Sequence, residues 1–505
     1  MSNALSDVAS ILKLFALFFS NRWTSQWEKD WDRQQALLAP AQDQPPPPKG
    51  KRGKKGKGQK KPKPVPSKSL SFYERVFSLR VTLWLLVYQR LSFDTTLKAV
   101  VSHVRKGGVD RLGKRGREKI SERIRSAHTS SYNDARQRLP LAFVQAALAF
   151  AGKQIQILVG WSHEGDQKPE PLDRPRQLLD GSTLKALATP QLIQEYPPAR
   201  GSKGASDWCL MRIVVGFCAR SGAVLSAILA STKVGEQQLA WQVMAQAARW
   251  VIWIGDRNFG IWSILAKAVL HDQDALVRLT HARAKKLMVK KKLRSGQERL
   301  IQWAASRHDK VAPGTEGLVV TGRLIYVRIK RGHSFIDLWL FTTLDAENYP
   351  VELLVKWYGQ RWQAELHFRS VKTHLDLAEL YVTTPEMARK EFYAALLGYN
   401  LVRAVMWKAG ENLENGDQTL SFQNARREVL EWLKDWGKSV AGSSADQPKW
   451  IRTLVEEVLL QRLPKRKRRR PSQPRMVRSR ATHWPILRGS RSEAQKRHAA
   501  NSKSG

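Results

Sequence analysis

The chain has 505 residues, 42% of them hydrophobic, which is enough for a sizeable core and two or three domains. Its 86 basic and 44 acidic residues give a formal net charge of +42, so the expected partners are polyanions such as DNA, RNA or an anionic membrane surface. Only two cysteines, Cys209 and Cys218, are present, and no run of 18 apolar residues occurs. These features disfavour a disulfide framework and a membrane-spanning helix, and they favour a reducing compartment.

The first 155 residues predict two helical parts separated by a linker. Residues 1–44 are rich in tryptophan, and Val8–Ser20 reads as an amphipathic helix rather than a signal peptide. Residues 45–68 contain proline, glycine and ten basic residues but no acidic one, so they cannot form a core. Residues 69–155 return to a helical spacing of apolar residues, which predicts a helical N-terminal domain.

From residue 173 to about 410 the pattern predicts a mixed α/β domain. Apolar strands and helices alternate, and 209–232 reads as two strands joined by the turn Arg-Ser-Gly. The other expected elements are strands at 176–180, 250–256 and 275–280, and helices at 236–248 and 258–272. This order is typical of a mixed sheet with helices packed on it.

Residues 281–349 interrupt that order with an expected β-rich insertion, in which 323–331 and 335–344 read as strands. A long helical pattern follows Tyr349-Pro350, and a helical C-terminal region spans 411–463. Residues 464–505 form an expected disordered basic tail, since the last 45 residues hold fifteen basic residues and one acidic residue.

Two predicted strands end at an aspartate, Asp180 and Asp256. Side chains converge where strands of an open α/β sheet end, because backbone pairing stops there. Gly181 follows the first aspartate and Gly255 precedes the second, and glycine permits close backbone approach. Taken alone, each aspartate is more often a turn or helix-capping residue, and Asp180 followed by Gly-Ser-Thr fits a cap.

The long helix carries a polar stripe made of Tyr358, Arg361, Glu365, Arg369 and Lys372. At about 100° per residue, these five positions fall within roughly 80° of one another on a helix. The stripe places one carboxylate among several cations, although such a stripe alone can be a solvated face with ion pairs between successive turns.

Three carboxylates and nearby cations suit phosphoryl transfer. Two Mg²⁺ ions about 3.5–4 Å apart can hold the attacking and leaving oxygens of an in-line displacement. Mg²⁺ prefers oxygen ligands and needs few carboxylates, because water and phosphate supply the rest. We therefore expect Asp180, Asp256 and Glu365 to be the catalytic and metal-binding residues, with two Mg²⁺ ions, or Mn²⁺ in their place.

At this point three blocks resemble the DDE transposases of bacterial insertion sequences, in the insertion sequence 4 group. The blocks are LLDGSTLKALATPQLIQEYPPARGSKG at 178–204, IGDRNFG at 254–260, and the Y-R-E-K spacing of Tyr358, Arg361, Glu365 and Lys372. The resemblance covers about residues 90–410 and leaves out the linker and both ends.

The resemblance implies an RNase H-like catalytic domain with a β insertion before the glutamate helix. It also implies nicking of transposon ends, attack by the freed 3′-OH on target DNA, binding to terminal inverted repeats, and a homodimer that joins two ends. By the same match, Tyr358, Arg361 and Lys372 contact DNA, and Arg369 joins them on the stripe. The implied location is the bacterial cytoplasm at the nucleoid, without a membrane partner.

An aromatic residue in this group can stack on a flipped base, and Trp362 and Trp339 are the candidates. Ordinary core packing is the alternative for each, since the chain has 19 tryptophans. The basic tail reads either as a nuclear localisation signal or as a nonspecific DNA anchor, and the transposase-like body favours the anchor.

Two other functions stay open. An RNase H-like nuclease without strand transfer has the same three acids, and the Tyr, Arg and Lys stripe favours transposition over it. A non-enzymatic DNA-binding relative is disfavoured by the intact triad. RNA binding is compatible with the charge, but no RRM- or KH-like motif is visible.

Overall fold

The computed structural model describes most of the chain between residues 11 and 464. The described ranges are 11–15, 17–18, 21–38, 76–113, 118–124, 126–161, 168–201, 204–288, 293–331, 334–414, 416–438, 447–464, 492–493 and 496. The chain divides into two units, Met1–Leu463 and Pro464–Gly505, and the fold below is that of the first. The predicted linker at 45–68 and nearly all of the basic tail lie outside the described residues.

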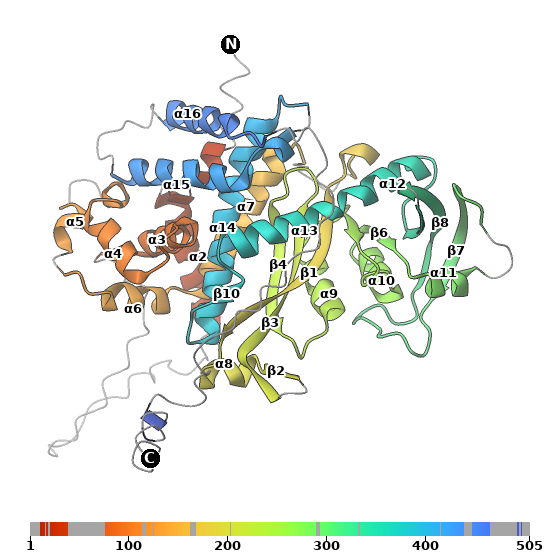
Figure 1. Cartoon of the computed structure of the whole chain (residues 1–505), viewed down its shortest axis with the longest axis horizontal. Helices are drawn as coiled ribbons and strands as arrows, with labels where there is room; N and C mark the ends of the chain where they lie inside the picture. Colours follow the sequence, from red (N-terminus) through yellow and green to blue (C-terminus); the bar gives the residue numbers. More distant parts are fainter. Residues whose placement is uncertain are drawn as a thin grey trace, which may run out of the picture. The chain divides into compact units, whose positions relative to one another are not determined.

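A mixed sheet forms the centre of this unit (Figure 1). Its five central strands stand in the order β4-β3-β1-β5-β6, with β1, β5 and β6 parallel and β3 antiparallel to both β1 and β4. The strands are β1 Arg176–Leu187, β3 Gly204–Cys218, β4 Val224–Ser231, β5 Ile252–Gly255 and β6 Asp274–Arg278. This arrangement, with helices on both faces, is the RNase H-like α/β fold that the sequence predicted. The turn between β3 and β4 is the expected hairpin.

The insertion continues the same sheet. After α11 (His281–Leu287), three antiparallel strands follow: β7 Gln297–Ala304, β8 Val319–Arg331 and β9 Ser334–Thr342. β9 pairs with β6, with Leu276 opposite Thr342, so the insertion extends the central sheet. The expected β-rich insertion is confirmed. The predicted strand 323–331 lies within β8, and the predicted strand 335–344 overlaps β9 but extends two residues beyond its end.

Alternate residues of β1 face different helical layers, as strand geometry requires. Leu178 packs into the larger core, with α7 (Leu141–Leu158), α13 (Trp362–Arg369) and α14 (Pro385–Gly410). Leu179 packs into a second core with α9 (Glu236–Ala245) and α10 (Trp262–Leu270). By length and composition alone α7 is apolar enough to cross a membrane, but in this fold it packs against α14 and β4.

The helices before and after the sheet share one core. The sequence predicts separate helical regions at 69–155 and 411–463, but Trp84 lies 5.2 Å from Trp436 and Phe15 lies 5.2 Å from Trp432 between ring centroids. The helices are α2 Asn21–Leu38, α3 Leu79–Leu91, α4 Leu97–Arg105, α5 Ile120–Arg123, α6 Ser130–Arg138, α14 Pro385–Gly410, α15 Phe422–Lys438 and α16 Gln447–Leu460. We call this assembly the helical body.

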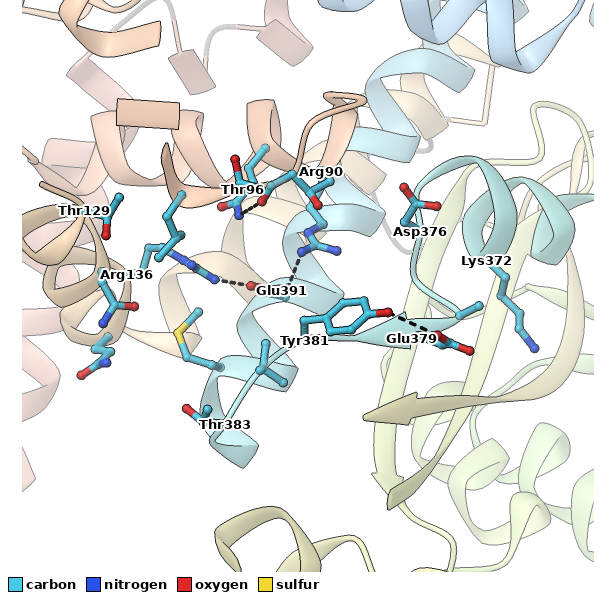
Figure 2. Close-up of a pocket in the computed structure, with 18 of the residues that line it drawn as sticks. Arg90, Thr96, Thr129, Arg136, Lys372, Asp376, Glu379, Tyr381, Thr383 and Glu391 are labelled. Atoms are coloured by element: carbon cyan, nitrogen blue, oxygen red, sulfur yellow. Dashed lines mark hydrogen bonds and ion pairs between the residues drawn. The ribbon is translucent and has the colours of Figure 1, made fainter. Parts of the chain in front are cut away.

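The long helix α14 joins the helical body to the sheet. Its Glu391 accepts hydrogen bonds from Arg90 of α3, at 2.5 Å, and from Arg136 of α6, and all three side chains are buried (Figure 2). Further along, the Asn400 side chain bonds to both backbone groups of Val224 in β4, each at 2.7 Å. One helix therefore fixes the position of the helical body against the sheet.

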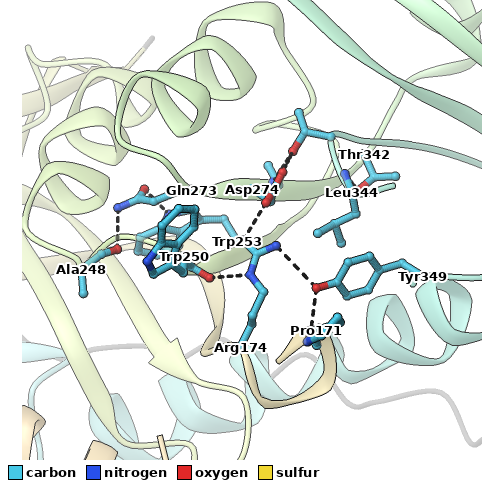
Figure 3. A network of polar contacts seen from close by, with 12 residues as sticks. Pro171, Arg174, Ala248, Trp250, Trp253, Gln273, Asp274, Thr342, Leu344 and Tyr349 are labelled. Carbon is cyan, nitrogen blue, oxygen red and sulfur yellow. Dashed lines mark hydrogen bonds and ion pairs between the residues drawn. The ribbon is translucent and has the colours of Figure 1, made fainter. Parts of the chain in front are cut away.

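A buried arginine ties together the strand ends opposite the predicted site (Figure 3). Arg174 donates to the Trp250 carbonyl at 2.9 Å, to the Asp274 carboxylate at 2.6 Å and to the Tyr349 hydroxyl at 3.5 Å. The Tyr349 hydroxyl in turn donates to the Pro171 carbonyl at 3.0 Å. The starts of β1, β5 and β6 are thus linked to the segment that leads into the glutamate helix.

Candidate active site

The two aspartates lie next to each other at one edge of the parallel strands. Leu179 of β1 pairs with Gly255 of β5, so Asp180 and Asp256 occupy the next position on adjacent strands. Asp256 follows the end of β5, as predicted. The prediction that a strand ends at Asp180 is wrong, because β1 continues to Leu187, paired with β3 along the way. What ends just before Asp180 is the pairing of β1 with β5, whose last pair is Leu179 with Gly255.

Local hydrogen bonds orient both carboxylates. Asp180 Oδ1 accepts from the Gly181 backbone N–H at 2.9 Å, and Asp256 Oδ1 accepts from the Asn258 N–H at 2.8 Å. Gly181 also makes room for a further acid, because a Cβ there would lie 2.0 Å from Glu236 Oε1.

The predicted single long helix is broken into three pieces. They are α12 Val351–Gln360, α13 Trp362–Arg369 and a π-helical turn at Ser370–His374, with Arg361 at the junction of the first two. The five-residue stripe therefore does not follow one regular helix. Arg361, Glu365, Arg369 and Lys372 still line a common cavity, whereas Tyr358 is half-buried and does not line it.

The cavity between these elements has a volume of about 500 Å³. All three predicted acids line it, from β1, from the end of β5 and from α13. The polar side chains on its wall are Asp180, Ser182, Asp256, Arg361, Glu365, Arg369, Lys372 and Thr373. We call it the catalytic cavity.

Cations hold this cavity together. Arg361 lies 3.1 Å from Glu365 Oε1 and 3.9 Å from Asp180 Oδ2, so one guanidinium contacts two of the three acids. Lys372 Nζ donates to Ser182 Oγ at 3.2 Å. The helix thus meets β1 at two places, and both bring positive charge to the carboxylates.

Burial changes the protonation of these groups. It raises the pKa of Asp180 to about 6, helped by the nearby Asp256 and Glu236 carboxylates and opposed by the Gly181 N–H and Arg361. Burial lowers the pKa of Lys372 and raises that of the Tyr358 hydroxyl. A carboxyl with a raised pKa among like charges is typical of a site built to receive a cation.

The oxygen donors fit a hard divalent cation in type, since Mg²⁺ and Mn²⁺ prefer carboxylates. In this conformation, no three acidic, histidine or cysteine side chains of the described residues stand close enough together to hold a metal ion. In this conformation the guanidinium of Arg361 is the counter-charge of both Asp180 and Glu365.

The two candidate stacking residues differ. Trp362 is 59% exposed, whereas Trp339 is 6% exposed and stacks on Tyr326 at 4.4 Å between ring centroids. The Trp339 ring therefore packs in the insertion core and is not open to a base in this conformation. Glu236 escaped the sequence analysis because an isolated acid at a helix start belongs to no motif. Gly181 was the only signal, as a residue that leaves space for a neighbour.

Comparison with known proteins agrees with this geometry. Residues 171–401 match the family model described as Transposase DDE domain, a range that includes all three acids. The chain is also 24% identical over 311 residues to the transposase InsG for insertion sequence element IS4 of Escherichia coli strain K12. That similarity covers 61% of this chain and 68% of the relative. The region that holds all three acids therefore matches the DDE domain of transposases, and the chain is similar to a transposase of an insertion sequence 4 element.

Proposed function

We propose that this chain nicks DNA at the ends of a transposable element and joins the freed 3′-OH to target DNA. The observation that carries the proposal is the catalytic cavity itself. Asp180, Asp256 and Glu365 come from three elements far apart in the sequence, and they line one wall with three cationic side chains. Such a surface can hold divalent cations and a DNA phosphate together.

Each residue takes a role from its place in the cavity. Asp180, Asp256 and Glu365 bind one or two Mg²⁺ or Mn²⁺ ions, which supply charge neutralisation and an activated attacking oxygen when bound. Arg361, Arg369 and Lys372 hold DNA phosphates in register, since phosphate contacts position the duplex. Tyr358, half-buried near Asp256 and Arg361, supports the wall from behind.

The DNA partners are terminal inverted repeats and target DNA, and a homodimer brings two ends together. The net charge of +42 supports a DNA partner, because basic surfaces attract the phosphate backbone. We propose on the same grounds that the protein acts at the bacterial nucleoid. We also propose that the catalytic domain spans about 173–410, with α14 serving both this domain and the helical body.

Substitution of the acids tests the proposal. Asp180→Ala, Asp256→Ala and Glu365→Gln should each lower DNA cleavage by about 1000-fold or more, as losses of essential catalytic groups do. DNA affinity, measured by fluorescence anisotropy, should survive. Glu352→Gln is the matched control, an exposed acid in the first turn of α12 that does not line the cavity.

The outcome separates the alternatives. Loss of binding in parallel with cleavage for all three variants would point to misfolding and refute the assignment. Cleavage without a joined product, in an assay with a supercoiled target and an end-bearing donor, would favour a nuclease without strand transfer.

A further inference from the structure

Glu236 lies behind the aspartates of the catalytic cavity, on the other face of the sheet. Side chains alternate between the two faces of a strand, so Asp180 points to the face of Leu178, and Gly181 points to the face of Leu179, which α9 covers. Glu236 is the first residue of α9, and a Cβ built on Gly181 would lie 2.0 Å from its Oε1 and 2.6 Å from its Cδ. The Glu236 carboxylate therefore packs directly against the residue that follows Asp180.

This contact explains why a glycine stands at position 181. Gly181 lies within β1, and its φ is not in the left-handed region, so its backbone does not require glycine. What the missing side chain provides is space for the Glu236 carboxylate. The Gly181 N–H donates to Asp180 Oδ1 at 2.9 Å, so Glu236 supports the group that orients Asp180.

The same side chain reaches the second aspartate through Asn258. The Glu236 carboxylate accepts a hydrogen bond from the Asn258 side chain, and the next residue, Gln237, donates from Nε2 to the Asn258 carbonyl at 3.0 Å. The Asn258 N–H in turn donates to Asp256 Oδ1 at 2.8 Å. The start of α9 thus holds the donor that orients Asp256.

The loop before α9 is itself fixed in place. Arg212 of β3 donates to the Val234 carbonyl at 2.5 Å, and its positive charge faces the half-buried Glu236. A glutamate in the first turn of a helix also interacts favourably with the helix dipole. That interaction alone requires neither a glycine at 181 nor a contact with Asn258.

We propose that Glu236 is a positioning residue of the active site, which fixes the separation of the Asp180 and Asp256 carboxylates by supporting Gly181 and Asn258 from the far face of the sheet. The proposal rests on the proposed function, because this separation matters only where both aspartates bind cations. Groups that orient the ligands of a metal ion typically contribute about 10- to 100-fold to its affinity.

Mn²⁺ binding to the full chain without DNA tests the proposal and requires no activity. Glu236→Ala removes both contacts and should weaken Mn²⁺ binding about tenfold, measured by titration calorimetry or electron paramagnetic resonance. Glu236→Gln keeps the shape of the side chain and can still accept from Asn258, so it should recover most of the affinity. Equally weak binding by Glu236→Gln and Glu236→Ala would overturn the positioning role.

Gly181→Ala tests the same contact from the other side. The added methyl group would displace the Glu236 carboxylate while every charge is kept, so Mn²⁺ affinity should fall about as far as in Glu236→Ala. In the double variant the methyl group has free space, and the affinity should match that of Glu236→Ala alone. Additive losses would show that the two residues act separately and would overturn the proposal.

Glu352→Ala is the matched control, because Glu352 is an exposed acid in the first turn of α12 and does not line the cavity. It should bind Mn²⁺ like wild type. If Glu236 serves the helix dipole alone, Glu236→Ala would lower the unfolding temperature in EDTA and leave Mn²⁺ affinity unchanged, which would refute the inference.

Asp180→Ala separates this failure from that of the proposed function. Loss of Mn²⁺ affinity in Asp180→Ala but not in Glu236→Ala would refute the positioning role alone. Unchanged affinity in both variants would refute the proposed cation site, and the inference with it.

Discussion

Arg361 contacts two of the three carboxylates that line the catalytic cavity. Its guanidinium lies 3.1 Å from Glu365 and 3.9 Å from Asp180, and only 17% of its side chain is exposed. A divalent cation bound by the same acids would face this positive charge at short range. Two like charges a few ångströms apart repel by about 1 kcal/mol or more, depending on the local dielectric. If these acids bind metal as proposed, Arg361 and the metal ion would compete for Asp180 and Glu365.

Removal of this charge should strengthen metal binding in the absence of DNA. Arg361→Gln is expected to tighten Mn²⁺ binding about tenfold, measured by titration calorimetry or electron paramagnetic resonance, because the competing cation is gone. DNA affinity should fall, since a phosphate contact is lost. Arg361→Lys keeps the charge and should resemble wild type in Mn²⁺ affinity. Weaker Mn²⁺ binding by Arg361→Gln would contradict the competition.

Asp180 should make the metal-free protein less stable as the pH rises. Its pKa is raised from 3.8 to about 6, so the folded state holds the proton more tightly than the unfolded state does. Stability is therefore lost as the pH rises from about 4 to about 6, and it stays reduced above that range. The loss is about 3 kcal/mol at neutral pH.

Asp180→Asn should recover this stability. In EDTA at pH 7.5 the variant should unfold a few degrees above wild type, and the difference should shrink near pH 4, where the wild-type carboxyl is protonated. Asp435→Asn, at a carboxylate that is 67% exposed, is the control and should show no such trend. A variant that melts below wild type at pH 7.5 would exclude the argument.

At the scale of elements, α14 depends on a buried acid shared by two arginines. The Glu391 side chain is 3% exposed and neutralises both Arg90 and Arg136. Glu391→Gln would leave two buried guanidinium groups without a counter-charge, and the free energy of unfolding should fall by about 3 kcal/mol or more.

Chemical denaturation in urea measures the effect of Glu391→Gln. Asp435→Asn on α15 removes a carboxylate that is 67% exposed and pairs with the exposed Lys438, so it should cost about 1 kcal/mol or less. Equal effects of the two substitutions would show that the buried cluster is not a special support of the fold.

The local sequence pattern predicted most strands and helices but not the residues at which they begin and end. The run before Asp180 reads as a short strand because its apolar part ends there, yet β1 continues because β3 pairs with it as far as Leu187. That pairing depends on residues some thirty positions away. The glutamate helix reads as continuous because a periodicity calculation assumes regular turns, and no proline marks the break at Arg361. The break separates Tyr358 from the cavity that the other four stripe residues line.

The three acids were predictable because their order and the Y-R-E-K spacing form a motif. The place of Glu236 behind two of them was not, since its neighbours Gly181 and Asn258 belong to other segments of the sequence. The joining of the N-terminal and C-terminal helices into one body was hidden for the same reason. Long-range packing of this kind has no local periodicity to reveal it.

At the scale of the whole molecule, charge should control DNA affinity. The last 45 residues hold fifteen basic residues and one acidic residue, and they continue beyond the compact unit that ends at Leu463. Each phosphate contact releases counterions, so the affinity should fall steeply with salt.

Removal of residues 464–505 should weaken DNA binding at all sequences, by about tenfold or more at physiological salt. The slope of log affinity against log salt concentration should fall by the equivalent of several phosphate contacts. The preference for transposon ends over random DNA should persist. A neutral Gly-Ser segment of equal length is the control for chain length. A selective loss of end preference, measured by competition binding, would refute the role of a general anchor.

The pairing of β9 with β6 has a consequence for how the molecule tolerates shortening. β6 has β5 on one side and β9 on the other, so it has no open edge. Excision of the insertion would leave the backbone donors and acceptors along one edge of β6 without partners. Exposed strand edges of this type pair with strands from other molecules. A trimmed chain would therefore tend to self-associate, which ties the solubility of the central sheet to a segment that contains none of the three acids of the cavity.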